Sequence, residues 1–252
     1  MKVGIFGDSH GDCTYLAWKK KYPDLGPGWP ELLADTRSLS VTNFSLGGSG
    51  TYYSYKLFLK NHTKFDKIIF IPSQHGRFDL KLSNEVVQII PGFVHAIEPM
   101  LGKFSKHSID YKVLSAAIEY CKYAIDFEKE QIFNDLLLKD ILDIRPDTII
   151  VPAFRYISFK FPEDCIPLTE LSFIEDEMMG ITRTDLRRGP PVWDIRKCHI
   201  TEEHNDVLYK KLLFALDNNQ RFAYLTKDDL VKPKKPSSFY FKPTDNGMPG
   251  NV

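Results

Sequence analysis

The sequence alternates short apolar runs, rich in β-branched residues, with longer segments of helical periodicity, and this alternation constrains its fold more than any other feature. The apolar runs occupy residues 2–6, 40–46, 67–71 and 148–154. Runs of this length and composition are typical of strands that are buried on both faces of a sheet. Each run ends at glycine, proline or polar residues, which mark turns.

Segments with helical periodicity separate or follow these predicted strands, at residues 31–35, 51–59, 108–142 and 201–216. The longest segment is predicted to form two helices divided near Asp126. Strands that alternate with helices favour a parallel sheet with helices on both faces. We therefore predict an α/β fold, a three-layer α/β/α sandwich with a mostly parallel sheet.

Polar residues follow three of the predicted strands, at residues 7–10, 47–48 and 73–75. In parallel α/β sheets, ligands bind outside the carboxyl ends of the strands. Because these three loops follow strands, we expect them to lie along one rim of the sheet. This rim is the predicted site.

Charge and hydropathy exclude several classes of partner. The chain of 252 residues carries 33 basic and 33 acidic side chains, so no global field attracts nucleic acid or an anionic membrane. No apolar stretch reaches the roughly 18 residues that a membrane span needs. We therefore expect no nucleic-acid partner and no membrane-spanning helix.

The amino terminus and the cysteines indicate a cytoplasmic protein. Residues 1–2 lead directly into a strand pattern, without the apolar core and cleavage site of a signal peptide. The cysteines are widely spaced, which suits reduced thiols better than a disulfide framework or a zinc site. They are Cys13, Cys121, Cys165 and Cys198.

The chain is predicted to form one domain over residues 1–231, followed by an irregular tail at 232–252 that is rich in proline, glycine and asparagine. Residues 80–108 show scattered apolar positions, and residues 162–197 have no clear periodicity. We predict that these two segments are insertions that cover the rim of the site.

The loops around Ser9, Gly48 and His199 contain the groups that a serine hydrolase needs, which are a nucleophile, a base and donors for an oxyanion. Ser9 offers the nucleophile and His199 the base. The backbone N–H groups of Ser9 and Gly48 offer the oxyanion donors. The simpler alternatives are that Ser9 is a turn or cap residue and that His199 only precedes a helix.

These loops resemble the motifs of SGNH (GDSL-type) hydrolases, in the same order along the chain. Residues 7–10 (Gly-Asp-Ser-His) are similar to the first block, whose serine is the nucleophile. Residues 43–49 (Asn-Phe-Ser-Leu-Gly-Gly-Ser) resemble the second, and Gly48 matches its oxyanion glycine. Residues 199–203 resemble the last block, in which a histidine precedes the final helix. The resemblance implies an SGNH hydrolase-like, flavodoxin-like fold and esterase activity.

The third block differs from the family pattern Gly-x-Asn-Asp. Residues 72–77 read Pro-Ser-Gln-His-Gly-Arg, so Gln74 stands where the family has the asparagine that donates to the oxyanion. We expect Gln74 to be the third oxyanion donor, although its longer side chain shifts the amide. His75 and Arg77 are alternative donors and candidate substrate-binding residues at the same rim.

The acid of the triad is also altered. The family has an aspartate three residues before the histidine, and here that position is Arg196. Asp194 lies five residues before His199 and is the candidate acid, with a dyad oriented by a backbone carbonyl as the alternative. Trp193 is a candidate to flank the substrate.

A metal-dependent phosphoesterase is the main rival interpretation of the first loop. Such enzymes open with a strand followed by Asp-x-His, which Asp8 and His10 match, and these side chains would hold one of two metal ions. The remaining histidine and asparagine motifs of that class have no counterpart in the sequence.

The sequence therefore predicts a serine esterase that acts on a small-molecule or glycan ester, with no metal and no organic cofactor. Because SGNH relatives that act on carbohydrates are common, removal of O-acetyl groups from a glycan is the preferred substrate class. A binding protein that keeps the fold without catalysis is the non-enzymatic alternative.

Overall fold

The central element of the structure is a parallel sheet. The computed structural model describes residues 1–12, 26–84, 86–91, 94–156, 159–181, 193–194, 197–234 and 240–241. Within them, β1 (Lys2–Phe6), β2 (Ser40–Asn43), β3 (Lys67–Phe70) and β6 (Ile149–Ile150) pair in the order β2-β1-β3-β6, all parallel. The predicted α/β fold with a mostly parallel sheet is confirmed.

The sheet continues for one residue beyond β6. Ile150 forms a parallel bridge with Phe222, and its N–H donates to the carbonyl of Arg221 at 2.8 Å. With this bridge, the spatial order of the segments is that of a flavodoxin-like sheet, in which the strand order reverses between the first and third strands. β1 and β3 therefore flank the point where such sheets bind their ligands.

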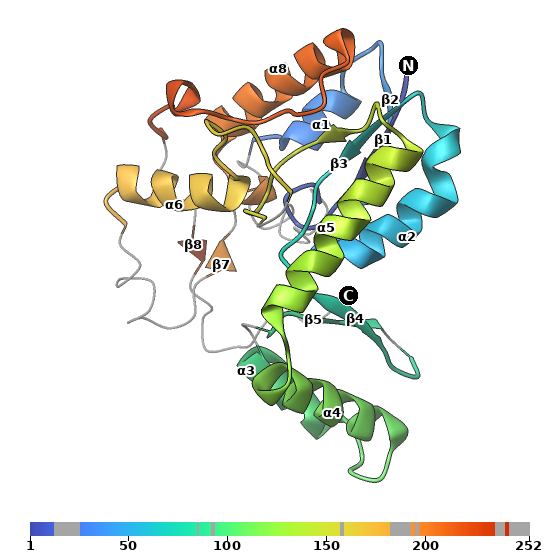
Figure 1. Cartoon of the computed structure of the whole chain (residues 1–252). Helices are drawn as coiled ribbons and strands as arrows, with labels where there is room; N and C mark the ends of the chain where they lie inside the picture. Colours follow the sequence, from blue (N-terminus) through green and yellow to red (C-terminus); the bar gives the residue numbers. More distant parts are fainter. Residues whose placement is uncertain are drawn as a thin grey trace.

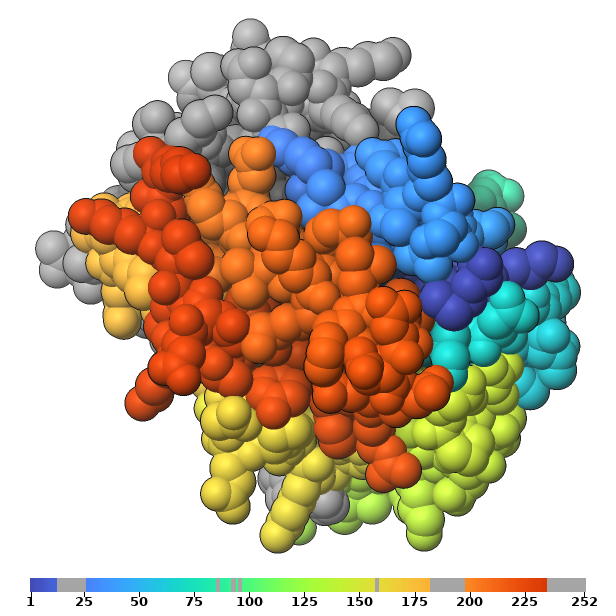
Figure 2. All heavy atoms as spheres, turned by 90° about the horizontal axis from the view of Figure 1, so that it is seen from above, coloured from blue at the N-terminus to red at the C-terminus, as the bar shows by residue number. Residues whose placement is uncertain are grey.

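Helices cover both faces of the sheet (Figure 1). α1 (Trp29–Ala34) and α8 (Glu202–Asn218) lie on one face, and α2 (Thr51–Asn61) and α5 (Phe127–Ile144) lie on the other. Viewed from above, α8 in orange lies beside the blue segment that contains α1 (Figure 2). Each predicted helix is present, with its ends moved by a few residues.

Successive strand residues point to opposite faces of the sheet, and both faces are buried. Val3 and Ile5 of β1 belong to the core beneath α1 and α8. Phe6 points the other way, into the core that contains Phe58 of α2 and Leu138 of α5. All of these side chains are fully buried. Burial on two faces explains why each strand reads as a continuous apolar run.

The segment after β3 builds a small lobe with its own core. β4 (Phe78–Lys81) and β5 (Val86–Ile89) form an antiparallel hairpin, followed by α3 (Val94–Ile97), the 3-10 helix η4 (Glu98–Lys103) and α4 (Ile109–Tyr123). The buried residues of the lobe are Leu82, Val87, Ile89, Val94, Ile97, Leu114, Ile118 and Cys121. The predicted insertion at residues 80–108 thus has regular structure, and its covering of the rim stays a prediction.

The long helical segment is divided as predicted. α4 ends at Tyr123 and α5 begins at Phe127. Asp126 is the N-cap of α5, because its carboxylate accepts hydrogen bonds from the N–H groups of Glu128 and Lys129.

The expectation of an irregular segment at residues 162–197 is wrong in its centre, where α6 (Leu168–Met178) forms. Leu168 and Leu171 are buried, but so are the polar side chains of Ser172 and Glu175. A buried helix face that mixes apolar and polar residues has no clear apolar periodicity, so the pattern did not reveal it.

Short elements complete the described chain. They are the 3-10 helices η2 (His62–Lys64), η5 (Lys197–His199) and η6 (Lys227–Asp229), and the antiparallel pair β7 (Trp193–Asp194) and β8 (Tyr240–Phe241). β8 falls within the predicted tail, of which residues 235–239 and 242–252 lie outside the described residues.

The described cysteines agree with the expectation of reduced thiols. Cys121, Cys165 and Cys198 are free and buried, and Cys13 lies outside the described residues. No helix in the described parts of the chain is long and apolar enough to cross a membrane.

Gly7 ends β1 at a point where no side chain fits. A Cβ on Gly7 would lie 2.7 Å from Cβ and Cδ1 of Ile71. The Gly7 carbonyl accepts hydrogen bonds from the hydroxyls of Ser49 at 3.2 Å and Ser54 at 3.1 Å, which ties the loop after β2 and the start of α2 to the end of β1. Close packing at Gly7 therefore holds the loops of the predicted site together.

We predict that Gly7→Ala lowers the free energy of unfolding by about 1–3 kcal/mol, the usual cost of overpacking. Chemical denaturation measures this loss. Gly102→Ala is the matched control, because a Cβ at Gly102 would meet nothing within 4 Å. Equal stability of the two variants would contradict the close contact between Gly7 and Ile71.

Candidate active site

The loop after β1 carries three buried polar residues at the carboxyl end of the sheet. Asp8 is fully buried, and Ser9 and His10 are 8% and 4% exposed. Gly11 N–H donates to the Asp8 carbonyl at 3.0 Å and closes the turn. The indole Nε1–H of Trp29, at the start of α1, donates to the His10 carbonyl at 3.0 Å. The loop is thus fixed from both ends.

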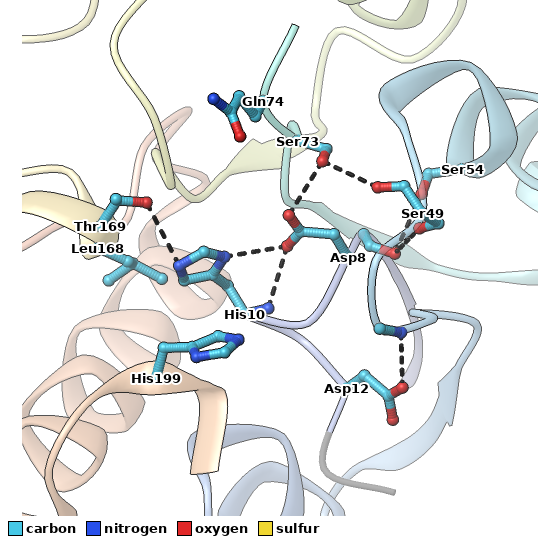
Figure 3. A network of polar contacts seen from close by, with 12 residues as sticks. Asp8, His10, Asp12, Ser49, Ser54, Ser73, Gln74, Leu168, Thr169 and His199 are labelled. Atoms are coloured by element: carbon cyan, nitrogen blue, oxygen red, sulfur yellow. Dashed lines mark hydrogen bonds and ion pairs between the residues drawn. The ribbon is translucent and has the colours of Figure 1, made fainter. Parts of the chain in front are cut away.

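Asp8 is the centre of the polar network in Figure 3. Its Oδ1 accepts from the backbone N–H of His10 at 3.0 Å and lies 3.1 Å from His10 Nδ1. Its Oδ2 accepts from Ser73 Oγ at 3.0 Å and forms an ion pair with Arg77 Nη1 at 3.4 Å. Burial alone would raise the pKa of Asp8, but the adjacent His10 and Arg77 hold it well below its usual range. Asp8 is therefore ionised.

His10 lies between Asp8 and a second imidazole. Its Nδ1 faces Asp8, its Nε2 lies 3.4 Å from Thr169 Oγ1, and its ring centroid is 5.0 Å from that of His199. Burial lowers the pKa of His10, and the attraction of Asp8 does not offset it. The edge of Phe154 packs on the same imidazole with the centroids 5.3 Å apart. His10 is therefore neutral at physiological pH.

The backbone around His199 is strained and held by α6. Cys198 and His199 have φ angles of 55° and 60°, in the left-handed region that side chains with a Cβ rarely adopt. The hydroxyl of Ser172 donates to the carbonyl of His199. Two residues further on, the N–H of Thr201 donates to Glu175 Oε1 at 2.9 Å. α6 thereby holds the loop that carries His199.

Glu175 and His204 form a buried pair behind this loop. Both side chains are 0% exposed, and His204 Nδ1 lies 2.5 Å from Glu175 Oε1. The N–H of Val231 donates to His204 Nε2 at 3.0 Å, so the ring proton is on Nδ1 and points to the carboxylate. Glu175 was not a candidate in the sequence, since acidic side chains are mostly exposed.

The second loop approaches the first from β2. Gly48 has a φ of 81°, and a Cβ there would lie 2.4 Å from Oε1 of Gln88 in the lobe. The N–H of the preceding Gly47 donates to Asp12 Oδ2 at 2.7 Å. Among the described residues, neither the N–H of Gly48 nor that of Ser9 makes a hydrogen bond. Both predicted oxyanion donors are thus free to bind a ligand.

In the third loop, residues 72–77, Ser73 and Arg77 contact Asp8, whereas Gln74 does not. Ser73 Oγ lies 3.0 Å from Asp8 Oδ2 and 2.8 Å from the Ser49 carbonyl, and its single proton is shared between these two acceptors, so one hydroxyl joins all three loops. Gln74 Oε1 accepts from Arg77 Nη2 at 3.4 Å. The Arg77 guanidinium lies over the ring of Phe154, 5.4 Å from its centroid. Gln74 and Arg77 therefore lie beside each other, and their predicted roles stay predictions.

His75 lies apart from this network. Its ring packs against Phe127 of α5 with the centroids 5.9 Å apart, and burial lowers its pKa. Its predicted part in substrate binding stays a prediction.

The predicted nucleophile and base belong to one region, but no hydrogen bond joins Ser9 and His199 within the described chain. In Figure 3 the His199 ring lies beside that of His10. Trp193 and Asp194 form β7, but their side chains lie outside what the structure describes, as does Arg196. The pairing of Ser9, His199 and Asp194 therefore stays a prediction.

The contacts of Asp8 do not suit the metal alternative. Both of its oxygens have partners, and one of them is the cationic Arg77, which would repel a metal ion. In the described parts of the chain, no cluster of three or more His, Cys, Asp or Glu side chains is arranged to hold a metal.

Comparison with known proteins does not identify a family. No family model matches the sequence, and no curated protein matches it. The fold is similar to that of phospholipase A1 from Streptomyces albidoflavus NA297, with 12% identity, 88% of this chain and 77% of that chain covered, and a TM-score of 0.29. A TM-score this low carries no argument about activity.

We predict that the free energy of unfolding decreases between pH 7 and pH 5. The pKa of His10 lies below its usual value in the folded chain, so below about pH 6.5 the unfolded chain binds this proton more readily. His10→Asn removes this contribution and should give a shallower decrease in denaturant titrations at several pH values. An unchanged slope in the variant would contradict the assignment.

Proposed function

We propose that this chain is a serine esterase that hydrolyses a carboxylic ester, with Ser9 as nucleophile and His199 as base. The observation that carries the proposal is the convergence at the carboxyl ends of β1 and β3. There Ser9 adjoins the buried Asp8–His10 pair, and the His10 ring lies 5.0 Å from that of His199. A nucleophile with imidazoles and a carboxylate nearby is the set of groups that acyl transfer requires.

In the proposed reaction, Ser9 Oγ attacks the ester carbonyl while His199 accepts the serine proton. The resulting oxyanion is bound by the N–H groups of Ser9 and Gly48, which have no partner in the described chain. His199 then gives its proton to the leaving alcohol. Water repeats these steps on the acyl-enzyme and regenerates Ser9.

The third loop supplies positive charge to the same rim. Arg77 has a side chain that is only 10% exposed, and its Nε makes no hydrogen bond within the described residues. A buried donor without a partner favours a ligand oxygen at this position. We propose Arg77, with Gln74 beside it, as the third oxyanion or substrate contact, and Asp194 as the acid that orients His199.

The substrate class is proposed from the resemblance to SGNH hydrolases. An O-acetylated glycan is the first class to test, with a small acetyl ester as the reference. The two alternatives are a metal-dependent phosphoesterase built on Asp8 and His10 and a binding protein without turnover. The ion pair between Asp8 and Arg77 disfavours the first.

We predict that the wild-type chain hydrolyses p-nitrophenyl acetate and an O-acetylated oligosaccharide, and that Ser9→Ala lowers kcat/KM by at least about a thousandfold. Initial rates and release of acetate measure both effects. Ser38→Ala is the matched control, since this exposed serine precedes β2 at the opposite end of the sheet and should leave turnover unchanged.

Two results would contradict the proposal. The first is no turnover and no labelling by a fluorophosphonate in the wild-type chain, which would favour the binding protein. The second is hydrolysis of a phosphodiester that requires Mn²⁺ and is lost in Asp8→Asn, which would favour the metal enzyme.

A further inference from the structure

The site contains a second hydroxyl that faces an imidazole backed by a carboxylate. Thr169 Oγ1 lies 3.4 Å from His10 Nε2, and His10 Nδ1 lies 3.1 Å from Asp8 Oδ1 (Figure 3). Three residues from two distant segments thus form a chain of contacts, which we call the Asp8–His10–Thr169 triad. Nucleophile, base and orienting acid follow one another in this way in hydrolases, where the contacts are often loose before substrate binds.

The ionised state of Asp8 determines which nitrogen of His10 carries the proton in this triad. An ionised carboxylate only accepts hydrogen bonds, so the proton of neutral His10 is on Nδ1 and points to Asp8. Nε2 then carries a lone pair, and this lone pair faces the hydroxyl of Thr169. Because burial keeps His10 neutral, the lone pair is available as a base. The tautomer is the one that proton abstraction from Thr169 needs.

Thr169 is placed by its backbone and not by its hydroxyl. Its N–H donates to the carbonyl of Ala153 at 3.0 Å, and the N–H of Leu168 donates to that of Pro152 at 3.0 Å. Within the described chain, His10 is the hydrogen-bond partner of the Thr169 hydroxyl, and there is no other. The hydroxyl is therefore not needed to anchor the start of α6, and its side chain remains half-buried at the rim.

Asp8 is suited to support a cation on His10. When His10 takes a proton from Thr169, both ring nitrogens carry protons, and the buried carboxylate lies against one of them. Ser73 Oγ and Arg77 Nη1 hold the other carboxylate oxygen, so Asp8 cannot turn away. A preorganised negative charge next to a developing imidazolium lowers the barrier to proton transfer.

We propose that Thr169 is a second nucleophile of this site, which is activated by His10 and Asp8 separately from Ser9 and His199. This inference rests on the proposed hydrolysis of carboxylic esters. Thr169 Oγ forms a bond to the ester carbonyl carbon as its proton moves to His10 Nε2. The bond to the leaving alcohol then breaks, and the alcohol takes that proton. Water hydrolyses the threonyl ester by the same steps and releases the acid.

The test combines covalent labelling with turnover. Trypsin separates the two hydroxyls, because Ser9 lies in the peptide of residues 3–19 and Thr169 in the peptide of residues 161–183. Wild type and Ser9→Ala are treated with a fluorophosphonate, and fragmentation spectra locate the adduct. We expect an adduct on Thr169 in Ser9→Ala, together with residual hydrolysis of p-nitrophenyl acetate.

Substitutions in the Ser9→Ala background separate catalysis from structure. Thr169→Val keeps the shape of the side chain and the backbone contacts, and it should lower the residual kcat by at least about tenfold with little change in KM. Thr169→Ser keeps the hydroxyl and should retain the residual activity and the adduct. His10→Asn should lower the residual kcat as much as Thr169→Val does. The variant that combines both substitutions should lower kcat no further than either one alone, because the two residues act as one unit.

The outcomes distinguish this inference from the proposed function. An adduct on Ser9 alone, with none on Thr169 in Ser9→Ala, overturns the inference and leaves the serine esterase in place. An adduct on Thr169 alone supports the inference and overturns Ser9 as nucleophile. Absence of adducts and of turnover in every variant overturns both. Equal residual activity in Thr169→Val and Thr169→Ser also overturns the inference.

Discussion

The burial of one carboxylate determines how the loops of this site are arranged. Asp8 is fully shielded from water, and an ionised group in such a place is tolerated only with several partners. Its partners come from the ends of two neighbouring strands, His10 after β1 and Ser73 and Arg77 after β3. Removal of any one would leave the buried carboxylate with fewer compensating contacts. The geometry of the rim follows from satisfying Asp8.

The sheet and its rim could be predicted from the sequence because their signals are local. Each strand reads as an apolar run that ends in a turn, and parallel strands align their carboxyl ends. The loops after β1, β2 and β3 therefore come together as expected. The role of His10 was not predicted, because the pattern Asp-x-His fits a metal pair as well as a hydrogen-bonded pair. Only the contact between His10 Nδ1 and Asp8 Oδ1 in the structure distinguishes the hydrogen-bonded pair from a metal-binding pair.

The other half of the site depends on tertiary contacts that leave no pattern. Thr169 lies in a helix whose buried face contains Ser172 and Glu175, so neither apolar periodicity nor a motif marks it. The left-handed backbone at His199 is equally invisible, since it results from hydrogen bonds with α6 rather than from a glycine. Long-range polar contacts of this kind override local preferences, and a single sequence does not display them.

The order of residues along the chain divides the site between early and late parts of synthesis. Asp8, Ser73 and Arg77 all lie within the first 77 residues, together with three strands of the sheet. Thr169 and His199 are added some hundred residues later, by segments that pack on the completed strands. Domains generally fold as units. The two halves of the rim therefore become ordered together, once the segments that carry Thr169 and His199 have been synthesised.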